Sequence, residues 1–196
     1  RNAQGEEEGR GTMVYASGDM YEGQWLAGGR HGYGKYTFAT GNVYEGEYVE
    51  DLNDGRGKMT YAHGDVYDGE WAEDMKQGQG KYTNAAGSYD GEWADSEKHG
   101  IGTFTYADGA VYEGEWAGSE QQGRGKETNA DGSSYDGEWA DGKKHGIGTY
   151  TWDDGEVDVG CYEAGAEVGQ GVRWSADRAE AWEMQAGEVV RSIPLD

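Results

Sequence analysis

One feature limits what this chain can fold into: a Gly-x-Gly step returns eight times at a nearly constant interval. The interval is 23 residues, except for a single interval of 22. Such a period predicts stacked copies of one small structural unit, each in contact only with its neighbours. The steps begin at Gly9, Gly32, Gly55, Gly78, Gly100, Gly123, Gly146 and Gly169.

A second motif accompanies the glycines and gives each copy a defined sequence. Twelve residues after most steps comes Tyr, an acidic residue, Gly, a polar residue and a second aromatic residue. The seventh copy is degraded to Asp158-Val-Gly-Cys-Tyr162 and the eighth is not recognisable. The array therefore weakens toward its C-terminal end, as a capping end would. The six clear copies begin at Tyr21, Tyr44, Tyr67, Tyr89, Tyr112 and Tyr135.

With both motifs in phase, the chain resembles the MORN (membrane occupation and recognition nexus) repeat family. The resemblance covers Gly9 to Gly171 as eight tandem repeats of ~23 residues. It implies a twisted, single-layer antiparallel sheet with a groove.

Alternation along each motif assigns the two faces of a strand. In Tyr21–Trp25 the rings and Gly23 share one face, because successive side chains of a strand point to opposite sides. Thr40-Gly41-Asn42 is typical of a tight turn, whereas Leu26 to His31 is expected to form a six-residue loop. Each repeat thus supplies two strands. The predicted fold is all-β: an elongated, twisted single-layer antiparallel sheet of tandem hairpins, with a two-layer sandwich as the alternative.

The expected boundaries follow from the array. Residues 1–8 form an acidic lead-in, residues 9–174 form the repeat array and residues 175–196 form a C-terminal cap. The cap is either a hairpin or a short helix. Alternation around Trp182 and Met184 favours the hairpin.

On the polar face, two columns of opposite charge are predicted to pair. Lys35, Lys58, Lys81 and Lys126 recur in one strand of the repeat, and Glu47, Glu70, Glu92, Glu115 and Glu138 in the other. We expect cross-strand Lys–Glu contacts there, each contributing about 0.2–1 kcal/mol.

Charge excludes several classes of partner. The chain has 39 acidic and 16 basic side chains, a formal charge of −23, so nucleic acid and anionic membrane surfaces are disfavoured. A lone Cys161 permits no internal disulfide, which fits a reducing, cytoplasmic location. The chain does not begin with Met, which leaves open that it is a segment of a longer protein.

The repeats show no residue pattern that indicates a catalytic or metal-binding site. His31, His99 and His145 hold equivalent places in different repeats, too far apart to converge on one metal ion. Carboxylates are so frequent that no pair stands out as a catalytic dyad. We predict no enzyme activity, no cofactor and no metal site.

The aromatic face is the predicted binding surface, because an open sheet leaves part of an apolar stripe exposed. Polar residues interrupt the stripe at Asn84, Glu127 and Asn129, where we expect hydrogen bonds to a ligand. The candidate groove residues are Tyr15, Trp25, Tyr36, Phe38, Tyr61, Trp71, Tyr82, Trp93, Phe104, Tyr106, Trp116, Trp139, Tyr150 and Trp152.

The leading functional hypothesis is a scaffold or adaptor whose concave aromatic groove holds a helix or an extended segment of a basic or amphipathic protein partner. The family resemblance implies a cytoskeletal, ciliary or axonemal assembly, and a homodimer through terminal repeats. Two alternatives stay open: a regulatory MORN module of a larger enzyme, and a phospholipid-binding module that tethers a membrane. The net negative charge disfavours the latter.

Overall fold

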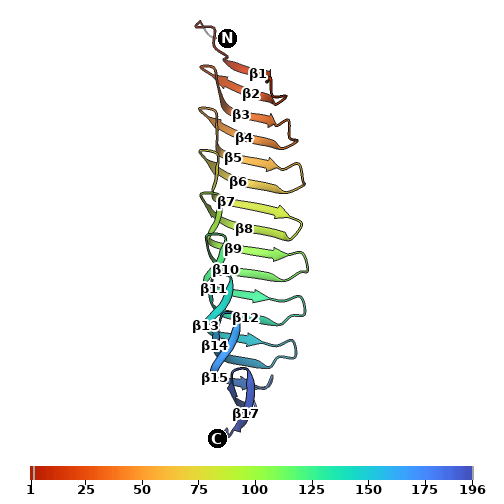
Figure 1. The fold of residues 1–196 in the computed structure, drawn as a ribbon, viewed down its shortest axis with the longest axis vertical. Coiled ribbons are helices and arrows are strands. Elements are labelled where there is room, and N and C mark those ends of the chain that lie inside the picture. Colours follow the sequence, from red (N-terminus) through yellow and green to blue (C-terminus); the bar gives the residue numbers. More distant parts are fainter. Residues whose placement is uncertain (2, 196) are drawn as a thin grey trace. The chain divides into compact units, whose positions relative to one another are not determined.

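The computed structural model describes residues 1 and 3–195, which fall into two compact units, Arg1–Glu97 (unit 1) and Lys98–Asp196 (unit 2). These described residues hold seventeen strands and no helix. Inside each unit, consecutive strands of the chain pair antiparallel and form an open sheet (Figure 1). The predicted all-β fold of tandem hairpins is confirmed.

The strand bounds repeat with the sequence. Unit 1 contains β1 (Gly9–Val14), β2 (Met20–Leu26), β3 (Gly29–Thr37), β4 (Val43–Val49), β5 (Leu52–Thr60), β6 (Val66–Ala72), β7 (Met75–Asn84) and β8 (Gly87–Ala94). After β9 (Glu97–Tyr106), unit 2 continues with β10 (Val111–Ala117), β11 (Glu120–Thr128), β12 (Ser134–Ala140), β13 (Lys143–Thr151), β14 (Val157–Glu163), β15 (Ala166–Trp174), β16 (Ala181–Gln185) and β17 (Glu188–Ile193).

The predicted six-residue loop from Leu26 to His31 is wrong. Strands β2 and β3 extend until a two-residue turn joins them, with positive φ at Ala27 (50°) and Gly28 (85°). Positive φ at both central residues is the mark of a type I′ turn, whose twist suits a hairpin. The equivalent turn at Glu50-Asp51 adopts it without glycine, at φ values of 49° and 70°. The additional strand pairing offsets the steric cost of these residues.

The Gly-x-Gly steps of β3, β5, β7, β11, β13 and β15 form β-bulges, which alternation alone did not show. Gly23 pairs with Gly34, but the next residue, Gln24, pairs with His31, so two residues of β3 are left over. Gly32 takes up the distortion with a φ of 60°. The Gln24 side chain then accepts a hydrogen bond of 2.7 Å from the free amide of Tyr33.

The register of the glycines explains why the predicted pairing of the Lys column with the Glu47 column is wrong, because Gly46 lies opposite Gly57. Lys58 lies opposite Glu45 on one side and Asp68 on the other. Glu47 instead accepts a bond of 3.2 Å from the amide of Arg56, as Gln24 does one repeat earlier. The second polar residue of the aromatic motif therefore caps the bulge.

The core of each repeat is a tyrosine packed on glycine. The first tyrosines of all six clear motifs, Tyr21 to Tyr135, are 0% exposed. The hydroxyl of Tyr67 donates to the carbonyl of Glu70 at 2.9 Å, and the other five make the same bond. A Cβ on Gly80 would overlap the ring of Tyr67. Glycine is therefore required beneath each ring.

Within each unit, the second aromatic residue of the motif joins successive tyrosines into one core. Tyr67 makes edge contacts with Trp71 (centroids 5.1 Å apart, 88°) and with Trp93 (5.2 Å, 81°). The Trp71 indole N–H donates to the carbonyl of Gly57 at 2.9 Å. Such ring pairs contribute about 0.5–1.5 kcal/mol each beyond the area that they bury.

The tail forms a hairpin. Strands β16 and β17 pair with each other, and β16 pairs with β15. Met184 is 0% exposed and Ala181 is 2% exposed, so the hairpin adds a small core of its own. Residues 181–193 are therefore strand and turn, and the helical alternative does not hold for them.

We predict that Gly57→Ala destabilises the chain by about 1–3 kcal/mol, because its Cβ would collide with the ring of Tyr44. Gly11 is the matched control: it holds the same place in the first repeat, where an added Cβ meets only Trp25, at 3.5 Å. Urea denaturation followed by circular dichroism measures both. Equal midpoints for the two variants would contradict the role given to the buried tyrosines.

Candidate functional site

The fourteen predicted groove residues divide into two sets. Trp25, Trp71, Trp93, Trp116 and Trp139 are only 5–8% exposed and form the core described above. Their indoles pack on tyrosine and bond to glycine carbonyls, so they cannot offer a partner more than an edge. The prediction is corrected for these five: they mainly support the surface from below, and Trp71 also lines the cleft described below.

The other nine form the surface that we call the outer aromatic row. Neighbouring rings of this row touch: Tyr36–Phe38 centroids lie 4.6 Å apart, and Tyr150–Trp152 centroids lie 4.7 Å apart. Trp152 is 40% exposed and the rest are half-buried. The row consists of Tyr15, Tyr36, Phe38, Tyr61, Tyr82, Phe104, Tyr106, Tyr150 and Trp152.

A row of cations on the same face was missed by the sequence analysis. Arg30, Lys76, Lys98 and Lys144 each lie two residues before a Gly-x-Gly step, and each lies over aromatic rings. The signal was present in this regular position. A cation among rings can only be recognised, however, once the neighbouring strand is known.

Lys76 shows the arrangement most fully. Its Nζ lies 4.6 Å from the ring centre of Tyr82, 4.9 Å from that of Trp93 and 5.2 Å from that of Tyr67. Burial lowers the pKa of Lys76 below its usual value. Attraction between the ammonium group and the ring faces compensates part of that desolvation.

In unit 1 the two rows border a cleft of about 450 Å³. Arg30 and Asn53 come from the position of the cation row, whereas Tyr36, Phe38 and Tyr61 belong to the outer aromatic row. The remaining lining residues are Tyr48, Met59, Trp71, Asp74 and Ser96. The cleft thus joins side chains from successive hairpins, and its walls are both aromatic and polar.

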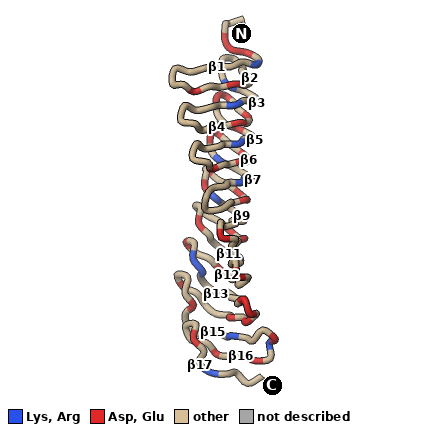
Figure 2. Tube along the Cα trace, turned by 90° about the vertical axis from the view of Figure 1, so that its right-hand side faces the viewer, with Lys and Arg blue, Asp and Glu red and all other residues tan. Residues whose placement is uncertain are grey.

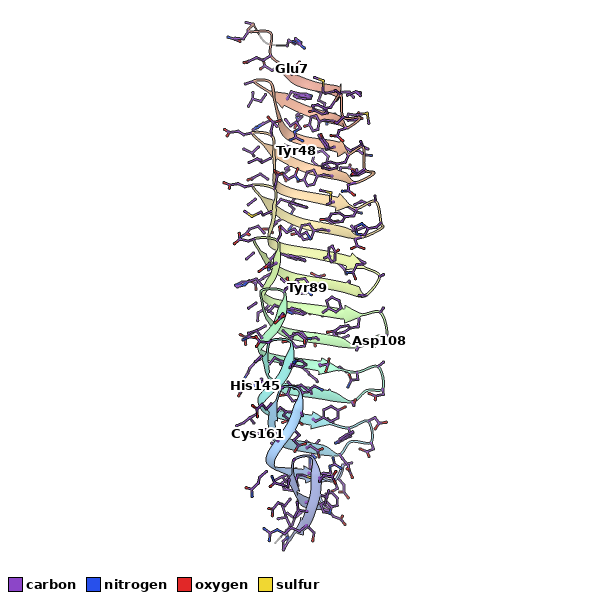
Figure 3. All side chains as sticks on the ribbon, viewed as in Figure 1. Glu7, Tyr48, Tyr89, Asp108, His145 and Cys161 are labelled. Atoms are coloured by element: carbon purple, nitrogen blue, oxygen red, sulfur yellow. The ribbon has the colours of Figure 1, made fainter. Side chains whose placement is uncertain are left out.

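Tyr48, labelled in Figure 3, is the unusual residue of this cleft. It stands where other repeats have tryptophan, and it is 1% exposed. Its hydroxyl has no hydrogen-bond partner among the described residues. The guanidinium of Arg30 lies 5.1 Å from its ring centre and also bonds to Asp51 at 3.1 Å.

Carboxylates at the turns hold the outer rings in place. Tyr36 donates to Asp19 at 3.0 Å, and Tyr82 donates to Asp65. The bond from Tyr82 is the main reason why the pKa of Asp65 is lowered. Burial, and then the bond to Asp65, raise the pKa of Tyr82 to about 12.

In unit 2 the outer aromatic row is interrupted by polar residues that bond within the chain. Glu127 pairs with Lys144 at 3.3 Å, and Asn129 donates to Ser133 at 2.9 Å. In unit 1, Asn84 likewise accepts the amides of Ala86 and Gly87. The hydrogen bonds expected from these polar residues to a ligand are thus already made inside the protein.

The described residues contain no cluster of three His, Cys, Asp or Glu side chains that could hold a metal ion. The same residues also contain no helix that is long and apolar enough to cross a bilayer. Cys161 is an exposed free thiol in β14.

The comparison with known protein families matches the repeats one by one. The MORN repeat family model matches seven segments: 3–20, 21–43, 44–66, 67–88, 89–111, 112–134 and 135–157. The sequence analysis predicted eight copies. The matches stop immediately before the degraded motif at Asp158. No curated protein matches the chain.

Among solved structures, the chain resembles the TCP10 domain of Danio rerio CPAP, at 11% identity and a TM-score of 0.55, over 98% of this chain and 92% of that one. It also resembles the SAS-4 (dCPAP) TCP domain of Drosophila melanogaster, solved in complex with a proline-rich motif of Ana2. That likeness has 11% identity and a TM-score of 0.50, over 90% and 89% of the two chains. At such identities the likeness shows the fold.

We predict that Tyr48→Phe leaves stability unchanged or raises it slightly, because it removes a buried hydroxyl that lacks a partner. Tyr44→Phe is the matched control and should cost about 1 kcal/mol, since it removes a bond of 3.0 Å to the carbonyl of Glu47. Urea denaturation midpoints of the two variants, compared with that of the wild-type chain, measure these changes in stability. A loss of stability in Tyr48→Phe as large as that in Tyr44→Phe would show that the Tyr48 hydroxyl has a partner.

We further predict that stability falls as the pH rises from 10 to 12. Burial raises the pKa values of Tyr21 and Tyr135 from 10.0 to about 12, so their phenols stay neutral in the folded chain. The contribution of these neutral phenols to the free energy of unfolding is complete below pH 10 and is lost as the pH approaches 12. Tyrosinate absorbance and circular dichroism, recorded together, measure it. Complete tyrosine ionisation near pH 10 in a folded chain would contradict the burial.

Proposed function

Because the chain belongs to the MORN repeat family, we propose that it is a non-enzymatic scaffold or adaptor that binds a segment of a protein partner along its outer aromatic row. The observation that carries this proposal is the cleft beside Tyr36, Phe38 and Tyr61. Half-buried tyrosine and arginine side chains around a concavity are typical of protein interfaces.

The comparisons give independent support. The SAS-4 domain, which has the same fold, is solved with a proline-rich motif of Ana2 on it. Peptide binding is therefore a use to which such a sheet can be put. A cytoskeletal or axonemal assembly in the cytoplasm is the setting that we propose for this chain.

Charge and the sheet edge define the remaining parts of the proposal. Acidic residues outnumber basic ones along the chain (Figure 2), which favours a partner with basic residues through electrostatic complementarity. The last strand, β17, pairs only with β16 among the described strands. Val189 and Val190 on this edge strand are exposed. Because an exposed edge can pair with a second chain, we include a homodimer through the terminal repeats in the proposal.

Crosslinked capture from the source cells tests the function. We expect wild-type chain to retain a partner that the double variant Tyr61→Ser/Tyr106→Ser loses, because both rings belong to the outer aromatic row. Tyr33→Ser is the control, since Tyr33 is 50% exposed and lines a different pocket beside Lys35 and Glu45.

The captured partner is then reconstituted with purified chain, and circular dichroism confirms that every variant is folded. Loss of binding in the double variant alone supports the proposal. Equal retention by all three proteins would place the binding site elsewhere.

A further inference from the structure

The spacing of the hairpins limits which ligand conformation can follow the outer aromatic row. In unit 1 the row recurs once per hairpin, at Tyr15, at Tyr36 with Phe38, at Tyr61 and at Tyr82. Two strand spacings of about 4.7–4.9 Å separate one hairpin from the next, or about 9.6 Å. A segment that crosses the strands must therefore present an equivalent side chain every 9.6 Å or so.

Three regular conformations can be compared with that distance. A polyproline II helix rises about 3.1 Å per residue with three residues per turn, so the same face returns every ~9.3 Å. In an extended strand, three residues span about 10 Å, but the third side chain points the opposite way. An α-helix needs about seven residues and 10.5 Å to return to the same face, and the error grows at each repeat.

The walls of the cleft suit the same conformation. Polyproline II has no internal backbone hydrogen bonds, so its carbonyls need donors from the binding site. Arg30 and Asn53 supply side-chain donors to the lining of the cleft, and Tyr36, Phe38 and Tyr61 supply its rings. Aromatic grooves with flanking donors are a recurring way to bind proline-rich segments.

Charge complementarity defines the ligand further. The two-residue turns beside the cation row carry acidic pairs at Glu50-Asp51 and Glu73-Asp74, followed by Asp95 one repeat later. All five side chains are exposed, and Asp74 also lines the cleft. This acidic row has the same period as the rings. A basic residue at every third position of the ligand would meet one turn after another.

We propose that the cleft of unit 1 binds a proline-rich segment in the polyproline II conformation, with prolines against the outer aromatic row and basic residues toward the acidic turns. The inference rests on the proposed function and specifies its ligand. Of the two expectations from the sequence, a helix or an extended segment, it favours the extended one, in a conformation whose period matches that of the sheet.

Three synthetic peptides of equal charge test the phase, and the first two also have equal composition. The first is (Pro-Pro-Arg)₄, which places all its arginines on one face of the polyproline II helix. The second has the same eight prolines and four arginines, with the arginines distributed over all three faces. The third is a basic amphipathic helical peptide of equal charge. Isothermal titration calorimetry with the full chain at physiological salt measures the affinities.

We expect the in-phase peptide to bind at least about tenfold more tightly than the scrambled one, a difference of ~1.4 kcal/mol. Tyr61→Ser should abolish that difference, whereas Tyr33→Ser, a change away from the cleft, should preserve it. Asp74→Asn should weaken only the in-phase peptide.

The other outcomes separate the two proposals. Equal affinity for the in-phase and scrambled peptides would overturn the inference, because binding would then depend on charge alone. Tighter binding of the helical peptide, lost in Tyr61→Ser, would overturn it while leaving the proposed function intact. Absence of binding by all three peptides would overturn the inference. The capture experiment would then decide the proposed function separately.

Discussion

The packing of one tyrosine on a pair of glycines supports everything else in this molecule. A single layer of strands has no facing layer to bury its apolar side chains, so each repeat must build a core on its own surface. Gly69 and Gly80 provide the space, since a Cβ on Gly80 would meet the ring of Tyr67 and a Cβ on Gly69 would meet its hydroxyl oxygen. The bulge beside them places the carbonyl of Glu70 where it accepts the tyrosine hydroxyl. Glycine, bulge and tyrosine are therefore one requirement.

A core that is complete within one repeat and its neighbour leaves other positions free to vary. From the second step on, the residues two places before the glycine steps are Arg30, Asn53 and Lys76 in unit 1 and Lys98, Gln121, Lys144 and Glu167 in unit 2. None of these changes disturbs the buried tyrosines, which remain 0% exposed throughout. Variation at such positions changes the surface chemistry along the array at little cost to the fold. A repeat protein of this kind can thus acquire a local binding site without altering its architecture.

The fold could be predicted from the sequence because glycine spacing and aromatic alternation are both local signals. How deeply each side chain of the site is buried could not be predicted in this way. Trp71 and Tyr61 lie on the same face by alternation, yet Trp71 is only 6% exposed because two tyrosines pack against it. Pairing Gly46 with Gly57 places Lys58 opposite Glu45, and alternation within one strand does not give this register between strands. The cation row depends on rings from other strands, which no single stretch of sequence displays.

The position of the cleft follows from the one clear motif that departs from the repeat. Where tryptophan stands, as in Trp71, the indole lies beside the preceding glycine step and bonds to the carbonyl of Gly57. Tyr48 replaces it with a smaller ring that makes no such bond, and its hydroxyl lacks a partner among the described residues. The guanidinium of Arg30 lies over that smaller ring, and both residues line the cleft. An exception that weakens the core of one repeat is thus the same feature that opens a concavity on the aromatic face, and departures from local rules are expected where a chain binds rather than where it only folds.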